Sequence, residues 1–207
     1  MLPQGNFNVT KTRAFQPTGI GDFQDIHDMK WATRTVAAGV IPTTSNFFSA
    51  APSSDPTVDR YEQGNALVTS GKIYTIFGLF FQVYGGAAAT LADLEKLVSW
   101  CTLRLVTNSK EFGMFPISMV PAGGGIYVQG GNISVTPAAA PGGQSVTGSI
   151  NGMPGRNASL TLANPLEIQA NQNFYCELVG PTVTPQTLTG AVICRIILDG
   201  VESRVKS

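Results

Sequence analysis

The residues best suited to chemistry gather near the start of the chain, around its single histidine. His27 lies between Asp25 and Asp28, and Asp22 precedes them. Imidazole and carboxylate groups serve in Ser-His-Asp catalysis and as ligands for divalent cations. The chain contains no G-x-S-x-G elbow, and the acidic spacing matches no EF-hand loop. We therefore interpret these acids as residues that favour the start of a helix, and we predict no catalytic residue and no metal site.

Two further patterns suggest chemistry at longer range. Glu167 and Glu177 have the residue type of a glycosidase pair, but nothing in the sequence fixes the distance between them. The triple glycine at 123–125 lacks the Gly-Lys-Ser/Thr ending of a phosphate-binding loop and predicts a turn between strands. We therefore predict that the protein is not an enzyme, takes no cofactor and has no small-molecule substrate.

The three cysteines have the spacing of structural residues. Cys101, Cys176 and Cys194 are far apart in the chain, and no CxxC pair occurs. Each lies in an apolar run, which favours a buried free thiol over a zinc ligand.

The elements that must position these residues are mostly short strands, from about residue 63 onward. The clearest spans 173–179, where Phe174, Cys176 and Leu178 alternate with more polar neighbours. Such alternation gives a strand one core face and one outer face. Further strands are predicted at 72–84, 101–105, 126–128, 133–135, 145–150, 157–162 and 191–199.

One helix stands among these strands. Thr90 and Asp93 have the spacing of a capping box, and apolar residues follow at helical intervals. No alternation of strand and helix runs along the chain, which disfavours a parallel sheet. The pattern predicts an all-β fold: an antiparallel β-sandwich, a single jelly roll of about eight strands with one short helix and an extended N-terminal arm.

The first part of the chain has a different composition. Residues 1–62 hold many of the charged residues and several prolines, and their apolar residues follow no sustained period. A short helix is expected from Asp22 to Thr33, and the rest reads as an arm that gains order on another surface. The predicted division is an extended N-terminal arm at 1–62 and a jelly-roll β-sandwich domain at 63–207.

Two predicted strands, 72–84 and 191–199, are apolar on both faces. An outer face this apolar must be covered, either by a neighbouring molecule or by the chain's own arm. The predicted interface residues are Tyr74, Ile76, Phe80, Tyr84, Ile193 and Ile197.

Charge is scarce and unevenly placed in the 207 residues. Lys+Arg and Asp+Glu number 13 each, so 13% of the residues are charged, against roughly 25% in a typical domain. A net charge of zero excludes a basic nucleic-acid binder. Residues 112–155 contain no charged side chain. Because charge is depleted at the centres of interfaces, this region is predicted to be buried or to face neighbours.

Two segments resemble a known family. Residues 91–125, LADLEKLVSWCTLRLVTNSKEFGMFPISMVPAGGG, resemble the middle of a single jelly-roll capsid protein of icosahedral viruses, particularly tailless bacteriophages. Residues 164–201, NPLEIQANQNFYCELVGPTVTPQTLTGAVICRIILDGV, resemble its last strands. The resemblance covers about residues 63–201 and is one of style and strand order. It implies a protomer of eight strands in two facing sheets and supplies no catalytic residues.

These observations lead us to expect a virion structural protein, assembled in the host cytoplasm. It would be a jelly-roll capsid subunit that self-assembles into an icosahedral shell through lateral contacts and arm exchange. Its partners would be copies of itself and other capsid proteins, and weak contact with packaged nucleic acid or an internal membrane stays open.

Two other functions remain as alternatives. One is a receptor- or carbohydrate-binding jelly-roll module of a viral spike or fibre, with Tyr61, Trp100, Tyr127 and Tyr175 as candidates for stacking on a sugar. The other is an enzyme on a β-sandwich, which has the weakest support because the chain offers one histidine and no convergent set of ligands.

Overall fold

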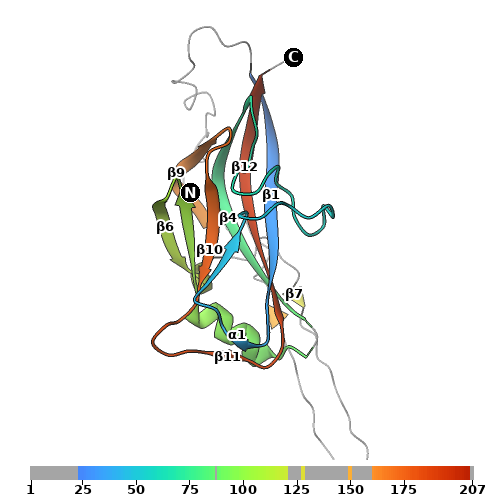
Figure 1. The fold of residues 1–207 in the computed structure, drawn as a ribbon, viewed down its shortest axis with the longest axis vertical. Helices are drawn as coiled ribbons and strands as arrows, with labels where there is room; N and C mark the ends of the chain where they lie inside the picture. Colours follow the sequence, from blue (N-terminus) through green and yellow to red (C-terminus); the bar gives the residue numbers. More distant parts are fainter. Residues whose placement is uncertain (1–22, 87, 121–126, 129–148, 151–159, 206–207) are drawn as a thin grey trace, which may run out of the picture.

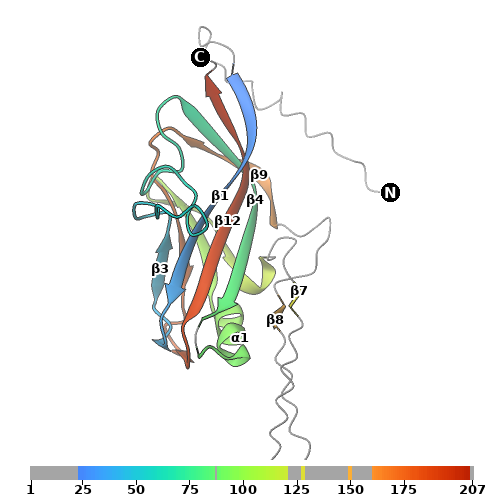
Figure 2. The same cartoon turned by 90° about the vertical axis from the view of Figure 1, so that its right-hand side faces the viewer.

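Two antiparallel sheets face each other, and one helix lies across an end of the pair (Figure 1, Figure 2). The computed structural model describes residues 23–86, 88–120, 127–128, 149–150 and 160–205. The expected all-β sandwich is confirmed. Among the described residues, no helix has the length and apolar character that crossing a membrane requires.

The first sheet contains the longest strands. Across the sheet they run in the order β1 (Phe23–Val36), β12 (Val192–Val205), β4 (Lys72–Gly85) and β9 (Leu160–Gln169). β1 and β12 pair over their whole length, so that Phe23 lies opposite Val205 at one end and Val36 opposite Val192 at the other. The predicted strands at 72–84 and 191–199 are therefore the two central strands of this sheet.

The second sheet is built from shorter strands. Their order is β3 (Thr44–Phe47), β10 (Phe174–Val179), β5 (Thr102–Thr107) and β6 (Lys110–Pro116). β10 and β5 confirm the strands predicted at 173–179 and 101–105. The short helix η2 (Ile117–Met119) follows β6. Two small ladders pair β2 (Gly39–Val40) with β11 (Thr187–Leu188) and β7 (Tyr127–Val128) with β8 (Ser149–Ile150). The strand predicted at 133–135 lies outside the described residues.

The core lies between the sheets and takes residues from both. Leu79 and Ile196 of the first sheet and Leu105 and Cys176 of the second are fully buried there. Burying large apolar side chains contributes about 1.5–3 kcal/mol each, which makes this cluster the main source of stability. Three aromatic rings pack together in one part of the core. The Phe48 ring centroid lies 5.1 Å from that of Tyr61 and 5.9 Å from that of Phe174.

β1 corrects two predictions for the start of the chain. The helix expected at 22–33 is wrong for residues 23–33, because they belong to the edge strand β1, which pairs with β12. The arm expected at 1–62 is wrong for residues 23–62, since β1 and β3 are strands of the two sheets and Phe47 and Phe48 are core residues. Residues 1–22 lie outside the described part.

A β-bulge in β4 corrects two of the predicted interface residues. The register with β9 and β12 shifts between Ile76 and Gly78. Because side chains alternate with a period of two, one extra residue exchanges the two faces of a strand. Tyr74 and Ile76 therefore point into the core together with Leu79, and both are fully buried. Opposite the bulge, a Cβ on Gly200 would lie 2.4 Å from the Thr75 carbonyl oxygen, so only glycine fits.

The predicted helix is confirmed as α1 (Leu91–Trp100), with its capping box. The Thr90 side chain accepts a hydrogen bond from the Asp93 N–H at 3.3 Å, and Asp93 Oδ2 accepts one from the Thr90 N–H at 2.9 Å. Asp93 also accepts hydrogen bonds from the Thr189 N–H at 2.7 Å and the Gly190 N–H at 3.3 Å. One buried carboxylate thus begins the helix and holds it against the segment before β12.

Candidate functional site

β1 separates the acidic residues around His27, because alternate residues of a strand point to opposite faces. The exposed His27 imidazole places Nε2 2.7 Å from Asp199 Oδ1 on β12. Asp28 instead joins a network of buried ion pairs. Within the described part of the chain, no group of three or more His, Cys, Asp and Glu side chains is placed to hold a metal ion.

The fold does not bring the two glutamates together. Glu167 is exposed on β9 of the first sheet, whereas Glu177 lies on β10 of the second. Glu177 is buried and accepts a hydrogen bond from Arg104 Nε at 2.5 Å. This hydrogen bond raises the pKa of the Arg104 guanidinium. Glu177 therefore belongs to a cross-strand ion pair, and the triple glycine at 123–125 lies outside the described residues.

The three cysteines are buried free thiols, as predicted. Burial raises the pKa of the Cys101 thiol to about 11, and it raises those of Cys176 and Cys194 further. Because the thiolate is the reactive form, these protonated thiols are inert at neutral pH.

Four of the six predicted interface residues lie together on the outer face of the first sheet. Ile197 of β12 pairs with Phe80 of β4, and Ile193 pairs with Tyr84. All four side chains are half-buried. Cross-strand neighbours on one face are in contact distance, so these residues form two short apolar rows.

Trp31 of β1 extends the row formed by Phe80 and Ile197. A polar row that includes Thr33 and Arg195 lies between the two apolar rows. Trp31 lies opposite Ile197, and the Arg60 guanidinium lies 5.4 Å from the centre of the Trp31 rings. Arg195 occupies the row between, where its Nε donates a hydrogen bond to Thr33 Oγ1 at 3.0 Å. The indole N–H of Trp31 is buried without a hydrogen-bond partner in the structure. We call the pairs Phe80–Ile197 and Tyr84–Ile193, with Trp31, the outer rows.

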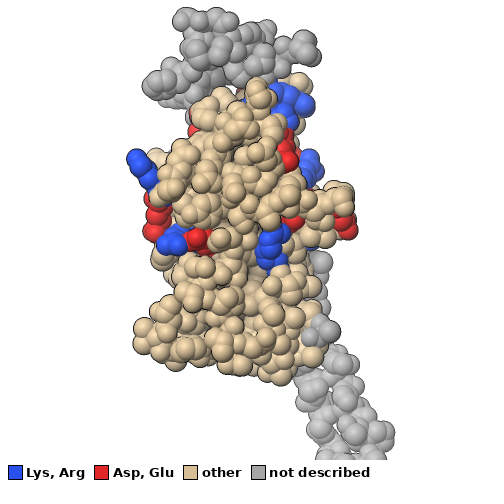
Figure 3. Space-filling model, viewed as in Figure 1, with Lys and Arg blue, Asp and Glu red and all other residues tan. Residues whose placement is uncertain are grey.

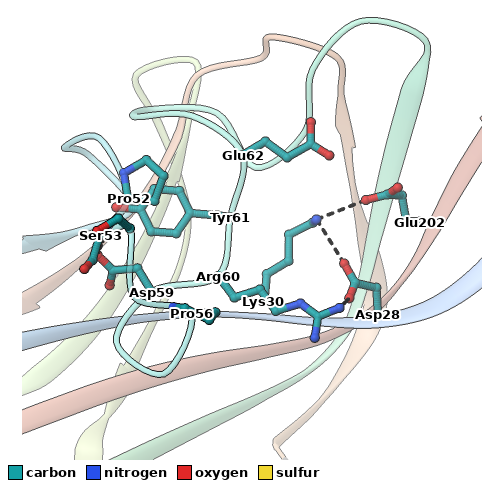
Figure 4. Close-up of a pocket in the computed structure, with 11 residues that line it drawn as sticks. Asp28, Lys30, Pro52, Ser53, Pro56, Asp59, Arg60, Tyr61, Glu62 and Glu202 are labelled. Atoms are coloured by element: carbon teal, nitrogen blue, oxygen red, sulfur yellow. Dashed lines mark hydrogen bonds and ion pairs between the residues drawn. The ribbon is translucent and has the colours of Figure 1, made fainter.

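A cluster of ion pairs lies beside the middle of β1, on the inner side of the first sheet (Figure 4). Lys30 is almost fully buried, and its Nζ donates hydrogen bonds to Asp28 Oδ2 and Glu202 Oε2, each at 3.0 Å. The same Nζ lies 5.1 Å from the centre of the Tyr74 ring. Removing an ammonium group from water costs several kcal/mol, which these partners must offset.

The loop that covers this cluster is also held by charge. Asp59 is buried and accepts hydrogen bonds from the Thr33 N–H at 2.9 Å and the Ser53 N–H at 3.0 Å. Arg34 Nη1 lies 3.1 Å from Asp59 Oδ1, and Arg60 Nη2 lies 2.6 Å from Asp28 Oδ1. We call residues 50–62 the strap, because they cross the outer edge of β1 and are tied to it at several points.

Glu62 ends the strap with an ion pair to Lys72 on β4. Burial acts to raise the pKa of the Glu62 carboxyl, but the hydrogen bonds from Lys72 and Thr69 outweigh burial and lower the pKa. The hydrogen bond to Glu62 raises the pKa of Lys72. The pair therefore stays ionised over a wide pH range.

A cavity of about 340 Å³ lies between the strap and the first sheet. Its lining includes Asp28, Lys30, Asp59, Arg60 and Glu202 (Figure 4). Each of these five groups has an ion partner within the chain. The arrangement ties the strap to the sheet, because these five charged groups are used in ion pairs within the chain. The sequence does not indicate this arrangement, because the acids around Lys30 resemble the start of a helix and its partner Glu202 lies far away in the chain.

The end of the sandwich that carries β2 and β11 displays no charged side chain on the face shown in Figure 3. Residues 35–54 and 178–194, which contain β2 and β11, include no Asp, Glu, Lys or Arg. Val40 and Val183 are 62% and 94% exposed there. We call the surface formed by residues 37–43 and 180–191 the neutral end. The charged residues of α1 are Asp93, which is buried, Glu95, which is exposed, and Lys96, whose Nζ donates a hydrogen bond to the Thr187 carbonyl oxygen at 2.7 Å.

The stacking candidates are scattered. Tyr61 is buried, Tyr175 is half-buried on β10, Trp100 is exposed at the end of α1, and nothing is described of the Tyr127 side chain. The three described side chains, Tyr61, Tyr175 and Trp100, therefore do not form one exposed aromatic platform. A comparison of the sequence with protein-family models finds no match, and a comparison with curated proteins finds none either.

Proposed function

We propose that this protein is a virion structural protein, a jelly-roll capsid subunit that assembles with copies of itself into an icosahedral shell. The proposal rests on the way charge is distributed over the sandwich. Ion pairs within the chain hold charged side chains under the strap, whereas residues 37–43 and 180–191 of the neutral end include no charged residue. A surface of neutral and apolar residues suits contact with further copies, because charge is depleted at the centres of protein interfaces.

The order of the strands supports the jelly-roll part of the proposal. Counting the eight strands of the two sheets along the chain, the first sheet has the order 1-8-3-6 and the second the order 2-7-4-5. A long hairpin with the pairs 1–8, 2–7, 3–6 and 4–5 gives these two orders when it wraps so that successive pairs enter alternate sheets. Wrapping of this kind defines a jelly roll.

The outer rows give the proposal a second surface. Their side chains are half-buried, and apolar rows that stay partly exposed on a sheet suit a face that another molecule covers. Arm exchange, the other contact expected from the sequence, is now restricted to residues 1–22, because residues 23–62 belong to the sandwich.

Electron microscopy and sedimentation of the purified full chain test the proposal. We expect closed particles or their partial assemblies for the natural sequence. Val183→Glu and Val40→Glu each place a charge at the neutral end and should abolish assembly while leaving the melting temperature nearly unchanged. Ser54→Glu adds the same charge to the exposed strap, where charges are frequent, and serves as the matched control.

Two outcomes of this experiment would contradict the proposal. A natural chain that stays monomeric at high concentration under all assembly conditions contradicts the capsid function. Equal loss of assembly in Ser54→Glu and Val183→Glu contradicts the role of the neutral end in particular.

A further inference from the structure

The outer face of the first sheet changes character beyond the outer rows, toward the end where Phe23 pairs with Val205. Here acidic residues surround apolar ones at the outward positions of the four strands. Met29 is 38% exposed, and Val201 and Ile73 are half-buried. We call this surface the acidic half. It is formed by Asp25 and Met29 of β1, Asp199 and Val201 of β12, Ile73 of β4 and Glu167 of β9.

The acidic half lacks basic side chains of its own. Asp25 and Glu167 are exposed, and the Asp199 side chain, which contacts His27, is 29% exposed. None of the outward positions of β1, β12, β4 and β9 in this half is Lys or Arg. Because complementary charge makes a contact specific, this surface suits a partner that carries basic and apolar residues together.

The first residues of the chain have this composition. Residues 1–22 contain two cations and a single acid, Asp22. Alternate residues of an extended chain share a face, and in 7–15 one such set is Phe7, Val9, Lys11, Arg13 and Phe15. The other set, Asn8, Thr10, Thr12 and Ala14, is polar or small. An extended segment of this sequence would have one side that is basic in its middle and apolar at its ends, which complements the acidic half.

We propose that residues 7–15 lie across the acidic half of their own chain. Lys11 and Arg13 then face its carboxylates, and the neighbouring apolar residues cover Met29 and Val201. The contact gives the exposed apolar part of this half a cover, and it places the cations of the segment where the sheet offers acids alone.

The place where β1 begins selects the same chain as the occupant. Phe23 lies at the end of the sheet that carries the acidic half, so residues 1–22 enter the sandwich beside this surface. Pro17, Gly19 and Gly21 separate the proposed segment from β1, and residues of these types favour turns that reverse a chain. A tethered segment also meets its own surface at a far higher effective concentration than a segment of another molecule does.

The length of the connection is sufficient. Asp199 pairs with Met29, and the strand from Phe23 to Met29 rises about 20 Å. The chain from Arg13 to Phe23 can extend about 33 Å. Residues 7–15 can therefore reach every carboxylate of the acidic half without disturbing β1.

This contact goes beyond the proposed function, because it forms within one chain and requires no shell. It leaves the outer rows, in the other half of the same face, to the contacts of the proposed function. In a shell, arm exchange would make the same contact between neighbours.

Limited trypsin digestion of the full chain tests the contact. Trypsin cleaves after Lys and Arg, so the rates of cleavage after Lys11 and Arg13, followed by mass spectrometry, report on the segment directly. The digestion is done at concentrations where sedimentation shows a monomer. We expect cleavage at both positions to be at least tenfold slower than in a synthetic peptide of residues 1–22.

Two matched double variants locate the contact. Asp199→Asn with Glu167→Gln removes two acids from the acidic half, and we expect cleavage at both positions to become at least fivefold faster. Glu95→Gln with Glu111→Gln removes two exposed acids from α1 and β6, and we expect rates within twofold of the natural chain. Melting temperatures of both variants show that the sandwich remains folded.

Four outcomes would overturn the proposal. Cleavage as fast as in the peptide would show that the segment is not held. Protection that rises with protein concentration would place the segment on a second copy. Equal rates in the two double variants, or protection that persists in Asp199→Asn with Glu167→Gln, would place the segment away from the acidic half. Particles with an unprotected segment would contradict this contact alone, whereas a protected segment in a chain that never assembles would contradict the capsid function alone.

Discussion

Two regions of the sandwich, the cluster under the strap and the neutral end, differ in how they place charged residues. Under the strap, Lys30, Asp28 and Glu202 are drawn out of water and pair with one another. At the neutral end, the segments around β2 and β11 contain no charged residue, and uncharged side chains such as Val183 face the solvent. Under the strap, the charged groups find their partners within one chain. At the neutral end, the uncharged surface suits contact with other molecules.

Among the changes that test this difference, truncation should have the largest effect on stability. Deleting residues 1–60 removes β1, β3 and most of the strap, so we expect a chain that does not fold, with no cooperative transition in circular dichroism. Deleting residues 1–20 leaves every described strand and should keep the melting temperature within a few degrees. A folded product from the longer deletion would contradict the role of β1 as a strand of the sandwich.

Loss of one buried charge should have the next largest effect. Lys30→Met leaves Asp28 and Glu202 buried with fewer partners, and we expect a loss of about 3 kcal/mol in the free energy of unfolding, measured in urea. Adding Glu202→Met should recover part of the loss. The control Lys96→Met, on α1 near the neutral end, should cost less than about 0.5 kcal/mol. Equal losses of unfolding free energy in Lys30→Met and Lys96→Met would show that the two regions do not differ in this respect.

Asp93 provides a pH test close to the neutral end. The backbone hydrogen bonds from Thr189 and Thr90 hold the pKa of the Asp93 carboxyl below its usual value near 3.8. Its contribution to stability is therefore present above that pH and is lost as the pH falls toward the lowered pKa of the folded state. We expect Asp93→Asn to melt several degrees lower than the natural chain at pH 7, with a smaller difference at pH 3. A difference independent of pH would contradict this role.

The smallest effect on stability should come from the outer rows. Ile197→Ala removes a half-buried side chain and should cost less than about 1 kcal/mol, whereas Ile196→Ala in the core should cost about 2–5 kcal/mol. Urea unfolding of the two variants measures the difference. A cost at Ile197 that matches Ile196 would show that the chain itself already covers the outer face.

The sequence predicts the sandwich because most of its strands alternate apolar residues on one face with polar residues on the other. It fails for β1, where the inward side mixes the charged Asp28, Lys30 and Arg34 with the apolar Ala32 and Val36. The alternation of apolar and polar residues is then broken, and the acids near His27 imitate the start of a helix. A pattern of residue types cannot show that a lysine is buried, because burial depends on partners such as Glu202, far away in the chain.

The site was predictable in part for a similar reason. Phe80, Tyr84, Ile193 and Ile197 share a face because the strands beyond Gly78 keep a regular period of two. Tyr74 and Ile76 were misplaced because the bulge before Gly78 inserts one residue. The extra residue, Phe77, is apolar like its neighbours, so the residue types alone do not mark the bulge. The exchange of faces can be seen only from the pairing of β4 with β9 and β12.

The pairing of the first and last strands also determines how the molecule would respond to force. Phe23 and Val205 lie side by side, and the ladder between β1 and β12 begins there (Figure 1). Hydrogen bonds in an antiparallel ladder run perpendicular to the strands. A pull that separates these two residues would therefore load the bonds one after another, like a zipper. The sandwich would open at low force from this end, whereas a pull along the strands would load many bonds at once and meet far greater resistance.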